Sequence, residues 1–365
     1  MARNKTILKR VLLSLLSIFI TLVLVVGGYL AYVIFSYSRI EDNQMLSVNN
    51  KKILTAADIG IEYTIISQNL GFGAYTADFT FFMDGGKESR AKSKDSVLEC
   101  IDKGAAKATS FNPNFILFQE VDTDSTRSYH TNQADILTEK FNTYSSVFAV
   151  NYHSAFLMYP IFNPHGKSNS GILTLSDIDM TSSTRRSLPI SSSLSKFLDL
   201  DRCYSVSRIN VTNGKELVIY NVHMSAYGGS DEIRTAQMTM LFDDMQKEYE
   251  KGNYCVCGGD FNHDFTGNST QVLNGGANVD FGWAQPFPAE LINKYSGITR
   301  AIDYTIGEQK PTCRNCDIPY KDGNFTIIVD GFLVSANVTV TYLENVQTGF
   351  EYSDHNPVVM KFLLN

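Results

Sequence analysis

The sequence has few of the residues that mark several classes of protein. Its six cysteines in 365 residues are too few for a disulfide scaffold, and nine prolines and 25 glycines exclude a collagen-like or linker-dominated chain. An excess of positive charge is also missing, because 31 basic residues are set against 38 acidic ones, for a net charge of −7. That balance argues against a purely electrostatic nucleic-acid binder, whose affinity comes from neutralising phosphates.

The sequence is rich enough in apolar residues to fold. Hydrophobic residues make up 44% of the chain and aromatic residues 12%, which excludes wholesale disorder. The sequence has no internal repeat or low-complexity tract. We therefore expect a folded protein with a sizeable core.

One long hydrophobic run stands at the N-terminus. The 25 residues from 11 to 35 carry no charge, and residues 1–10 carry four basic residues and no acid. A helix of that length extends roughly 37 Å, enough to cross a hydrocarbon core of about 30 Å. The run is also longer than the apolar stretch of a cleaved signal peptide. We therefore expect a cytoplasmic tail over 1–10, a transmembrane anchor over 11–35 and a polar tether over 36–55.

The charges beside this run predict its orientation. Basic residues precede the run and only Arg39 follows it closely, which places the N-terminus in the cytoplasm. Residues 56–365 would then form one domain outside a cell membrane. After residue 40 the chain holds 26 basic and 38 acidic residues, so the external part has a net charge of −12.

Strand-like and helix-like patterns mix along the external part. Helical patterns cover 93–109 and 230–252, each beginning at a serine with acidic residues in its first turn. Runs rich in β-branched and aromatic residues predict strands over 61–70, 114–121, 171–175, 208–211, 216–223, 254–259, 325–334, 338–343 and 357–363. Since strands outnumber helices and some neighbours read as hairpins, we expect a mixed, sheet-rich α/β domain.

Two cysteines have a spacing typical of redox or zinc sites. Cys313 and Cys316 form a CxxC pattern, but a second CxxC or a nearby histidine pair is missing, which disfavours zinc. A local disulfide and two free thiols both remain open.

Six segments carry polar side chains at or beside a predicted strand. Oxygen atoms of Asn, Asp and Glu are the ligands that a hard divalent cation prefers, and two histidines with acidic neighbours supply acid, base and orienting groups. The side chains concerned are Asn69; Glu120; Asn221 and His223; Asp260, Asn262 and His263; Asp330; Asp354 and His355. Together they predict metal-assisted attack of water on a phosphoester, with Mg²⁺ or Mn²⁺ as the ion.

These motifs resemble the successive signatures of the endonuclease/exonuclease/phosphatase superfamily, the deoxyribonuclease I-like fold. The matching segments are Gln119-Glu120, Asn221-Val222-His223, Gly259-Asp260-Phe261-Asn262, Asp330 and Ser353-Asp354-His355, within roughly residues 60–365. The resemblance implies a four-layer sandwich of two mixed β-sheets flanked by helices. It also implies a phosphoester hydrolase, in a group that includes nucleases, sphingomyelinases and inositol-phosphate phosphatases.

The resemblance further implies roles for five of these residues at the expected metal and phosphate. Glu120 would be the principal metal ligand, supported by Asn69 and Asp354. Asp260 would orient or deprotonate the attacking water. Asn262 would hold a phosphate oxygen.

The two histidines receive their roles in the same way. His355, oriented by Asp330, would contact the scissile phosphate or act as base, and His223, beside Asn221, would be the general acid or a phosphate ligand. Which histidine is acid and which is base stays open. Nuclease members often support the first histidine with an acid just before the strand at 171–175, but residues 164–170 contain no carboxylate.

The substrate stays open at this stage. Asn221, Tyr227, His263 and Arg314 belong to the motifs, adjoin them or lie in loops, and are candidates for substrate binding. The acidic charge disfavours long nucleic acid and the anchor favours a small or lipid-derived phosphoester, with an extracellular nuclease as the alternative. A catalytically silent binding module of the same fold is a second alternative, although the intact motifs argue against it. The sequence indicates no obligate protein partner.

Overall fold

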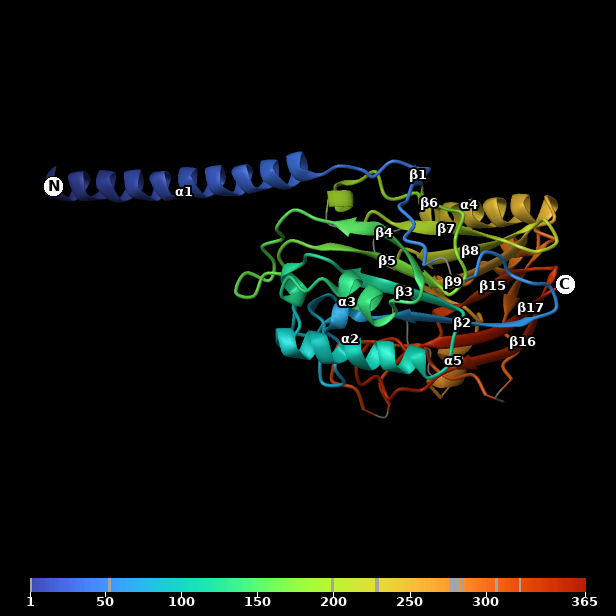
Figure 1. Cartoon of the computed structure of the whole chain (residues 1–365). Helices are drawn as coiled ribbons and strands as arrows, with labels where there is room; N and C mark the ends of the chain where they lie inside the picture. Colours follow the sequence, from blue (N-terminus) through green and yellow to red (C-terminus); the bar gives the residue numbers. More distant parts are fainter. Residues whose placement is uncertain are drawn as a thin grey trace.

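A long helix projects from a folded body that contains two large β-sheets (Figure 1). The structure is a computed structural model and describes residues 2–51, 54–197, 200–226, 230–275, 283, 285–305, 308–321 and 323–365. The helix, α1 (Ala2–Ser36), contains a stretch from Lys5 to Ser36 that is long and apolar enough to cross a membrane.

The two sheets are both mixed. Parallel pairing occurs between β2 and β3 and between β8 and β9, and the other pairs within these sheets are antiparallel. The seven-stranded sheet has the order β1 (Gln44–Met45), β6 (Ser182–Ser187), β7 (Cys203–Asn210), β8 (Glu216–His223), β9 (Tyr254–Asp260), β15 (Asp330–Ser335), β12 (Ile298–Ala301). The six-stranded sheet has the order β16 (Val338–Asn345), β17 (Val358–Leu364), β2 (Glu62–Asn69), β3 (Phe115–Asp122), β5 (Asn169–Ser176), β4 (Ser145–His153).

Helices cover the outer faces of the sheets (Figure 1). The helices α2 (Lys94–Thr109) and α3 (Gln133–Lys140) lie on the six-stranded sheet, and α4 (Asp231–Glu250) lies on the seven-stranded sheet. Short helices α5 (Ser269–Leu273) and α6 (Ala289–Ile292), and the small pairs β10 (His263–Asp264) with β11 (Gln285–Pro286) and β13 (Cys313–Arg314) with β14 (Thr326–Ile327), complete the fold. The predicted four-layer sandwich is confirmed.

The continuous apolar runs of the inner strands follow from this layering. In β2, Ile65 faces the core between the two sheets and Ile66 faces the core beneath α2, and both are fully buried. A strand covered on both faces needs apolar residues at successive positions rather than at alternate ones. The serines that precede α2 and α4 cap them, since Oγ of Ser93 accepts from the backbone N–H of Ser96 at 3.0 Å.

Several boundaries differ from the sequence-based expectation. The run at 325–334 is divided into β14 and β15, because Ile328 and Val329 pair with neighbouring loops rather than with a sheet strand. The strands β4 and β6 were not predicted, and β6 reads as a polar Ser-Arg segment. The segment expected to be a tether contains β1, which pairs with β6, so part of it lies in the sheet.

Both sheets direct the ends of their parallel strands to the same region. Asn69 at the end of β2 is in register with Gln119 on β3, and His223 at the end of β8 is in register with Asp260 on β9. Gln119 donates to Oδ1 of Asn221 at 2.8 Å and so joins the two sheets directly behind these ends. The predicted functional residues therefore meet at one edge of the sandwich.

A buried ion pair supports this edge. The Arg127 guanidinium donates to both carboxylate oxygens of Asp122 at 2.8 and 3.0 Å, and Ser128 Oγ donates to the same carboxylate at 2.7 Å. The side chains of Asp122 and Arg127 are 0% and 8% exposed. The Arg127 guanidinium also lies 3.9 Å from the centre of the Phe72 ring.

We expect Asp122→Ala to lower the free energy of unfolding by about 3–5 kcal/mol, because it leaves a buried guanidinium without its counter-charge. Chemical denaturation of the full chain in detergent micelles measures the loss. The control is Glu99→Ala on α2, where Glu99 pairs with Lys103 at 2.8 Å but both side chains are largely exposed, so the loss should stay below about 1 kcal/mol. Similar losses in the two variants would contradict the importance of burial.

Candidate active site

The strand ends surround a cavity of about 260 Å³. Its lining combines carboxylates, amides, imidazoles and guanidinium groups with aromatic and aliphatic side chains. The polar lining consists of Asp84, Glu120, Arg127, Asn151, Ser170, Arg202, His223, Asp260, Asn262, Arg314, Asp354 and His355. The remaining lining consists of Phe72, Tyr75, Phe81, Met83, Tyr152, His165, Leu200, Ala226, Trp283 and Cys313.

Glu120 reaches this cavity through an irregularity in its strand. The register of β3 against β5 shifts between Phe118 and Val121, and Glu120 has a left-handed backbone with φ of +53°. Left-handed backbone is rare for residues other than glycine, and a bulge redirects the side chain it carries. The Asn69 side chain lies beside it, with Nδ2 at 3.2 Å from Oε1 of Glu120 and 3.1 Å from Oδ2 of Asp260.

Asp354 completes an oxygen-rich group of side chains with Glu120 and Asn69. Burial raises the pKa of Asp354 to about 7 and the neighbouring charge of Glu120 acts in the same direction, against the opposing effects of His355 and Arg314. Two carboxylates that repel each other in this way suit a divalent cation, because the cation removes the repulsion. These residues fit a divalent cation.

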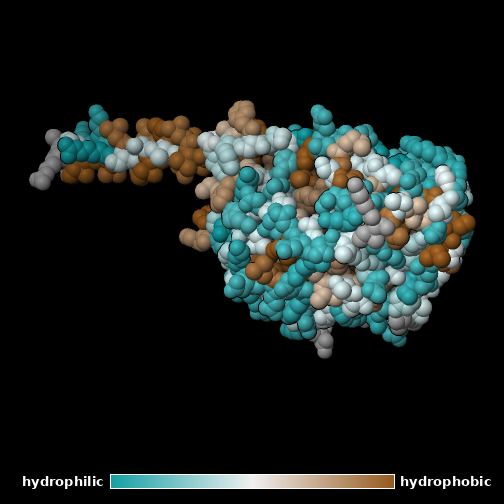
Figure 2. Space-filling view, viewed as in Figure 1, coloured by the Kyte–Doolittle hydropathy of each residue, from teal (hydrophilic) through white to brown (hydrophobic). Residues whose placement is uncertain are grey.

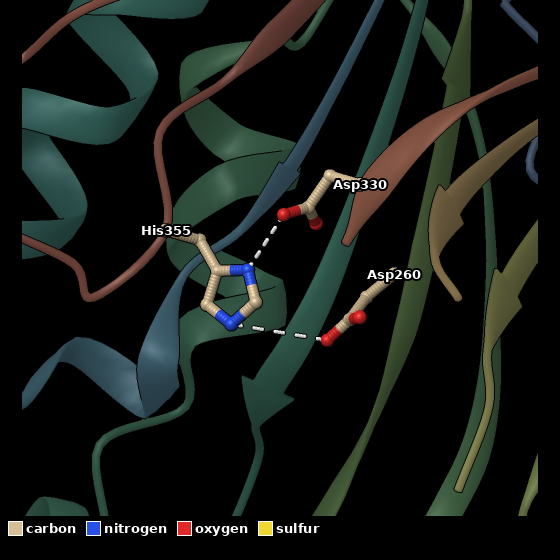
Figure 3. A group of neighbouring side chains, drawn as sticks. All are labelled: Asp260, Asp330 and His355. Carbon is tan, nitrogen blue, oxygen red and sulfur yellow. Dashed lines mark hydrogen bonds and ion pairs between the residues drawn. The ribbon is translucent and has the colours of Figure 1, made fainter. Parts of the chain in front are cut away.

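A second group is formed by Asp260, Asp330 and His355 (Figure 3). Nδ1 of His355 lies 2.8 Å from Oδ2 of Asp330, and Nε2 lies 3.8 Å from Oδ2 of Asp260. Burial disfavours the charged imidazole, but Asp330 and the other acidic groups outweigh it and raise the pKa of His355 well above its ordinary value. Burial and Asp330 also raise the pKa of Asp260 to about 7, although His355 opposes this.

This second group offers ligand atoms that all lie within 4.8 Å of one another, so it too could hold a metal ion. However, a protonated His355 already supplies positive charge between the two carboxylates (Figure 3). Glu120 itself has a weaker partner: among the described residues its ion-pair contact is with His223, at 3.9 Å, and burial lowers the pKa of His223 well below its usual value. The charge distribution therefore favours Glu120 and its neighbours as the metal side.

Asn262 lies two residues after Asp260, a member of the second group. It has a left-handed backbone with φ of +52°, and its backbone N–H donates to Oδ1 of Asp260 at 2.9 Å. Its Nδ2 donates to the carbonyl oxygen of Met224 at 2.9 Å, and the residue lines the cavity. This position allows the hydrogen bond to a phosphate oxygen that the resemblance implied.

His223 lies between the two groups. Its Nε2 is 3.6 Å from Oδ2 of Asp260, and its Nδ1 is 3.3 Å from the Asn151 side-chain amide on β4. Burial, together with the positive charges of Arg202, His355 and Arg127, lowers the pKa of His223 well below its ordinary value. The side chain that contacts Nδ1 of His223 is thus an amide on β4, outside the segment 164–170 in which a supporting carboxylate was expected, and the lowered pKa favours a neutral His223.

The structure does not bring every predicted substrate-binding residue to the cavity. Asn221 is fully buried between the sheets, where Nδ2 donates to the carbonyl oxygen of Leu173 at 3.1 Å and Oδ1 accepts from Gln119, so it joins the sheets instead of lining the cavity. His263 is buried with Nδ1 at 2.6 Å from the carbonyl oxygen of Phe261 and is not among the lining residues. Tyr227 lies outside the described residues.

Arg314 does line the cavity, and two further arginines join it. Arg314 is 1% exposed, and its Nη2 donates to the carbonyl oxygens of Thr76 and Phe79 at 3.1 and 3.2 Å. Arg127 and Arg202, which the sequence did not single out, also line the cavity, although Arg127 is paired with Asp122. The thiols of Cys313 and Cys316 are free and buried, which removes the disulfide alternative in this structure.

Paired carboxylates and imidazoles at the facing ends of two sheets, beside oxygen ligands for a cation, define a hydrolase of phosphoester bonds. The chain belongs to the Endonuclease/Exonuclease/phosphatase family, which matches residues 66–355. The family predicted from the motifs is therefore confirmed. Comparison with curated proteins gives no significant match.

Solved structures share the fold at low sequence identity. An endonuclease/exonuclease/phosphatase from Beutenbergia cavernae is 16% identical with a TM-score of 0.53, over 83% of this chain and 72% of its own. A family protein from Leptotrichia buccalis is 15% identical with a TM-score of 0.53, over 82% and 99%. ANGEL2, a 2′,3′-cyclic phosphatase solved with adenosine-2′,3′-vanadate, is 13% identical with a TM-score of 0.54, over 90% and 99%.

We expect Asn151→Asp to raise the pKa of His223 by about 1–3 units, because an opposite charge at this distance stabilises the imidazolium. Histidine NMR titration of the full chain in micelles measures the shift. The matched control is Asn151→Ser, which removes the amide without adding charge and should leave the pKa low. An unchanged titration in the Asp variant would show that Asn151 does not govern the charge of His223.

Proposed function

We propose that this protein is a divalent-metal-dependent phosphoester hydrolase that acts outside the membrane on a small or lipid-derived phosphoester. The observation that carries the proposal is the pairing, within one cavity, of an oxygen-rich group around Glu120 with the Asp260–His355–Asp330 group. The first suits a cation and the second suits proton transfer. Such a pair is what attack of water on phosphorus requires.

Glu120, Asn69 and Asp354 would hold Mg²⁺ or Mn²⁺. When bound, the ion neutralises charge on a phosphate oxygen and lowers the pKa of water. Asp260, whose pKa of about 7 allows it to exchange a proton near neutrality, accepts the proton of the attacking water. His355, kept protonated by Asp330, donates a hydrogen bond to the phosphate, and Asn262 holds a second phosphate oxygen.

His223 completes the site from the seven-stranded sheet. Because it is neutral, it serves the phosphate as a hydrogen-bond donor through Nε2 rather than as a charged partner. The nearby positive charge comes instead from the guanidinium groups of Arg202 and Arg314, since Arg127 is paired with Asp122. Guanidinium groups suit the anionic phosphate oxygens that stay bonded to phosphorus during hydrolysis.

The cavity favours a compact substrate. Its volume of about 260 Å³ is just below the usual range for ligand sites, and aromatic side chains form part of its wall. The external part of the chain carries a net charge of −12, which opposes long polyanions such as DNA or RNA. Orientation by α1, with residues 1–10 in the cytoplasm, residues 11–35 in the membrane and 56–365 outside it, would place the cavity near lipid.

The full chain in micelles should hydrolyse bis-p-nitrophenyl phosphate or p-nitrophenyl phosphate with Mg²⁺ or Mn²⁺, and EDTA should abolish the activity. Glu120→Gln keeps the shape but removes the ligand charge, so turnover should fall by roughly 100-fold or more. Release of p-nitrophenol measures both effects. The control is Glu99→Gln on the outer face of α2, which should act like the wild type. Turnover that resists EDTA would overturn the metal mechanism.

A substrate panel identifies the class of phosphoester. It should contain plasmid DNA, RNA, sphingomyelin, inositol phosphates and sugar phosphates, each with wild type, Glu120→Ala and His355→Ala. We expect turnover of a lipid or small phosphoester that both variants lose. Preferential turnover of DNA or RNA would support the nuclease alternative, and equal rates in all three proteins would show a contaminant.

A further inference from the structure

The loop that joins β4 to β5 exposes an unusual run of large apolar side chains. We refer to residues 154–168 as the β4–β5 loop. Met158 and Tyr159 are 55% and 68% exposed, and Ile161 and Phe162 are 78% and 102% exposed. The loop contains no acidic residue and one basic residue, Lys167, in a domain that is otherwise acidic. Contiguous apolar surface of this kind marks a site of interaction.

This loop lies against the outer part of α1. The Tyr29 hydroxyl donates to the carbonyl oxygen of Phe156 at 3.2 Å and accepts from the N–H of Met158 at 3.1 Å, and the Tyr32 hydroxyl accepts from the N–H of Phe156 at 3.0 Å. Figure 2 shows brown and tan atoms at the edge of the folded body beneath α1. In Figure 1 the loops beyond β4 extend toward the side of the body from which α1 projects.

The position of these contacts along α1 determines how deep the β4–β5 loop would lie in a bilayer. Tyr29 precedes the end of α1 at Ser36 by seven residues, which corresponds to about 10 Å along a helix. If α1 spans a bilayer, its two tyrosines lie at the level where tyrosine is enriched, the interface between hydrocarbon and water. The β4–β5 loop then lies at the same level, beside the helix.

Further contacts fix the folded body relative to α1. Arg39, just after the helix, forms an ion pair with Asp201, and the backbone N–H of Ile40 donates to Oδ2 of Asp201 at 2.7 Å. The chain then enters the sheet as β1. The loop therefore stays beside α1 because the body is attached at two places.

The base of the loop forms part of the cavity wall. The Tyr159 ring packs on Phe82 with centroids 5.7 Å apart, and Phe82 packs on His165 at 5.9 Å. His165 lines the cavity, and its Nδ1 lies 2.9 Å from the carbonyl oxygen of Ser89. Arg90 Nε donates to the carbonyl oxygen of Pro164 at 2.5 Å. The exposed tip is thus rigidly connected to the cavity.

We propose that the β4–β5 loop inserts its apolar tip into the outer interface of the bilayer that α1 spans, and that it holds the cavity mouth at the lipid surface, so that the substrate is a membrane lipid phosphoester. This inference rests on the proposed function and deepens it. Transfer of apolar side chains from water into the interface is favourable, and the charge of Lys167 complements anionic head groups. The bilayer is the occupant that continuity with α1 indicates.

Cysteine labelling of the full chain in phosphatidylcholine nanodiscs tests insertion. The six native thiols are all buried, so a bimane label will react at an introduced site. The test variant is Phe162→Cys, the reference is Val23→Cys in α1, and the control is Thr212→Cys at the exposed turn before β8, at the opposite end of that strand from His223. Quenching by 5-doxyl phosphatidylcholine reports contact with lipid.

We expect quenching in the Phe162→Cys and Val23→Cys variants and none in Thr212→Cys. A label at position 162 that stays unquenched, or that is shielded by a second copy of the protein without quenching by lipid, overturns the insertion. An unquenched label at position 23 overturns the membrane anchor as well. None of these outcomes depends on catalysis.

Activity measurements separate this inference from the proposed function. The double variant Ile161→Ser/Phe162→Ser should hydrolyse bis-p-nitrophenyl phosphate like the wild type. With phosphatidylcholine vesicles that contain sphingomyelin, phosphatidic acid or a phosphatidylinositol phosphate, it should lose roughly tenfold or more in rate, since two apolar side chains no longer enter the interface. Wild-type turnover of the soluble ester with no turnover of any lipid overturns the lipid inference alone, as does an equal rate of the variant on vesicles. No turnover of either substrate overturns the proposed function.

Discussion

Mutual repulsion of carboxylates around one cavity is the constraint on which the active-site structure depends. Asp260 and Asp330 are buried, and Glu120 and Asp354 face the same space. Negative charges so close together are unfavourable unless positive charge lies between them. His355 supplies it on one side, between Asp330 and Asp260, and the Glu120 side calls for a cation. The need for charge balance thus divides the cavity into a proton-handling half and a metal-binding half.

The backbone takes on strain to place these groups. Glu120 and Asn262 both have left-handed backbones, and neither is a glycine. Glycine is used where a side chain would collide: a Cβ atom at Gly71 would lie 2.7 Å from Oδ1 of Asp354, and one at Gly259 would lie 2.1 Å from the carbonyl oxygen of Val222. Unfavourable conformations that occur together at one site are typical of catalytic centres, where the surrounding fold maintains them.

Much of this arrangement could be predicted from the sequence, because the signals lie within single strands and short motifs. The apolar runs that lead to Asn69, Glu120 and His223 are strands buried on both faces, so the short polar segments that close these runs mark the strand ends in the sequence. Motifs placed the metal-side and proton-side residues in a family whose fold was then confirmed. Asn151 escaped notice because it lies in β4, a strand without a strong pattern, and contacts His223 from 72 residues away.

Two motif residues lie away from the cavity lining for a related reason. Asn221 and His263 belong to the motifs, but a motif does not say on which side of a strand its members point. Asn221 lies between the sheets, where it joins them, and His263 contacts the carbonyl oxygen of Phe261 and does not line the cavity. Arg127 and Arg202 were missed because arginines in loops are common, and only tertiary contacts distinguish those that line a cavity.

The single tryptophan of the chain, Trp283, is part of the aromatic wall of the cavity. Its ring lies edge-on to Phe325, with centroids 6.4 Å apart. All of the tryptophan emission of the protein therefore originates next to the catalytic groups. Intrinsic fluorescence becomes an optical signal of cavity occupancy, without any added label.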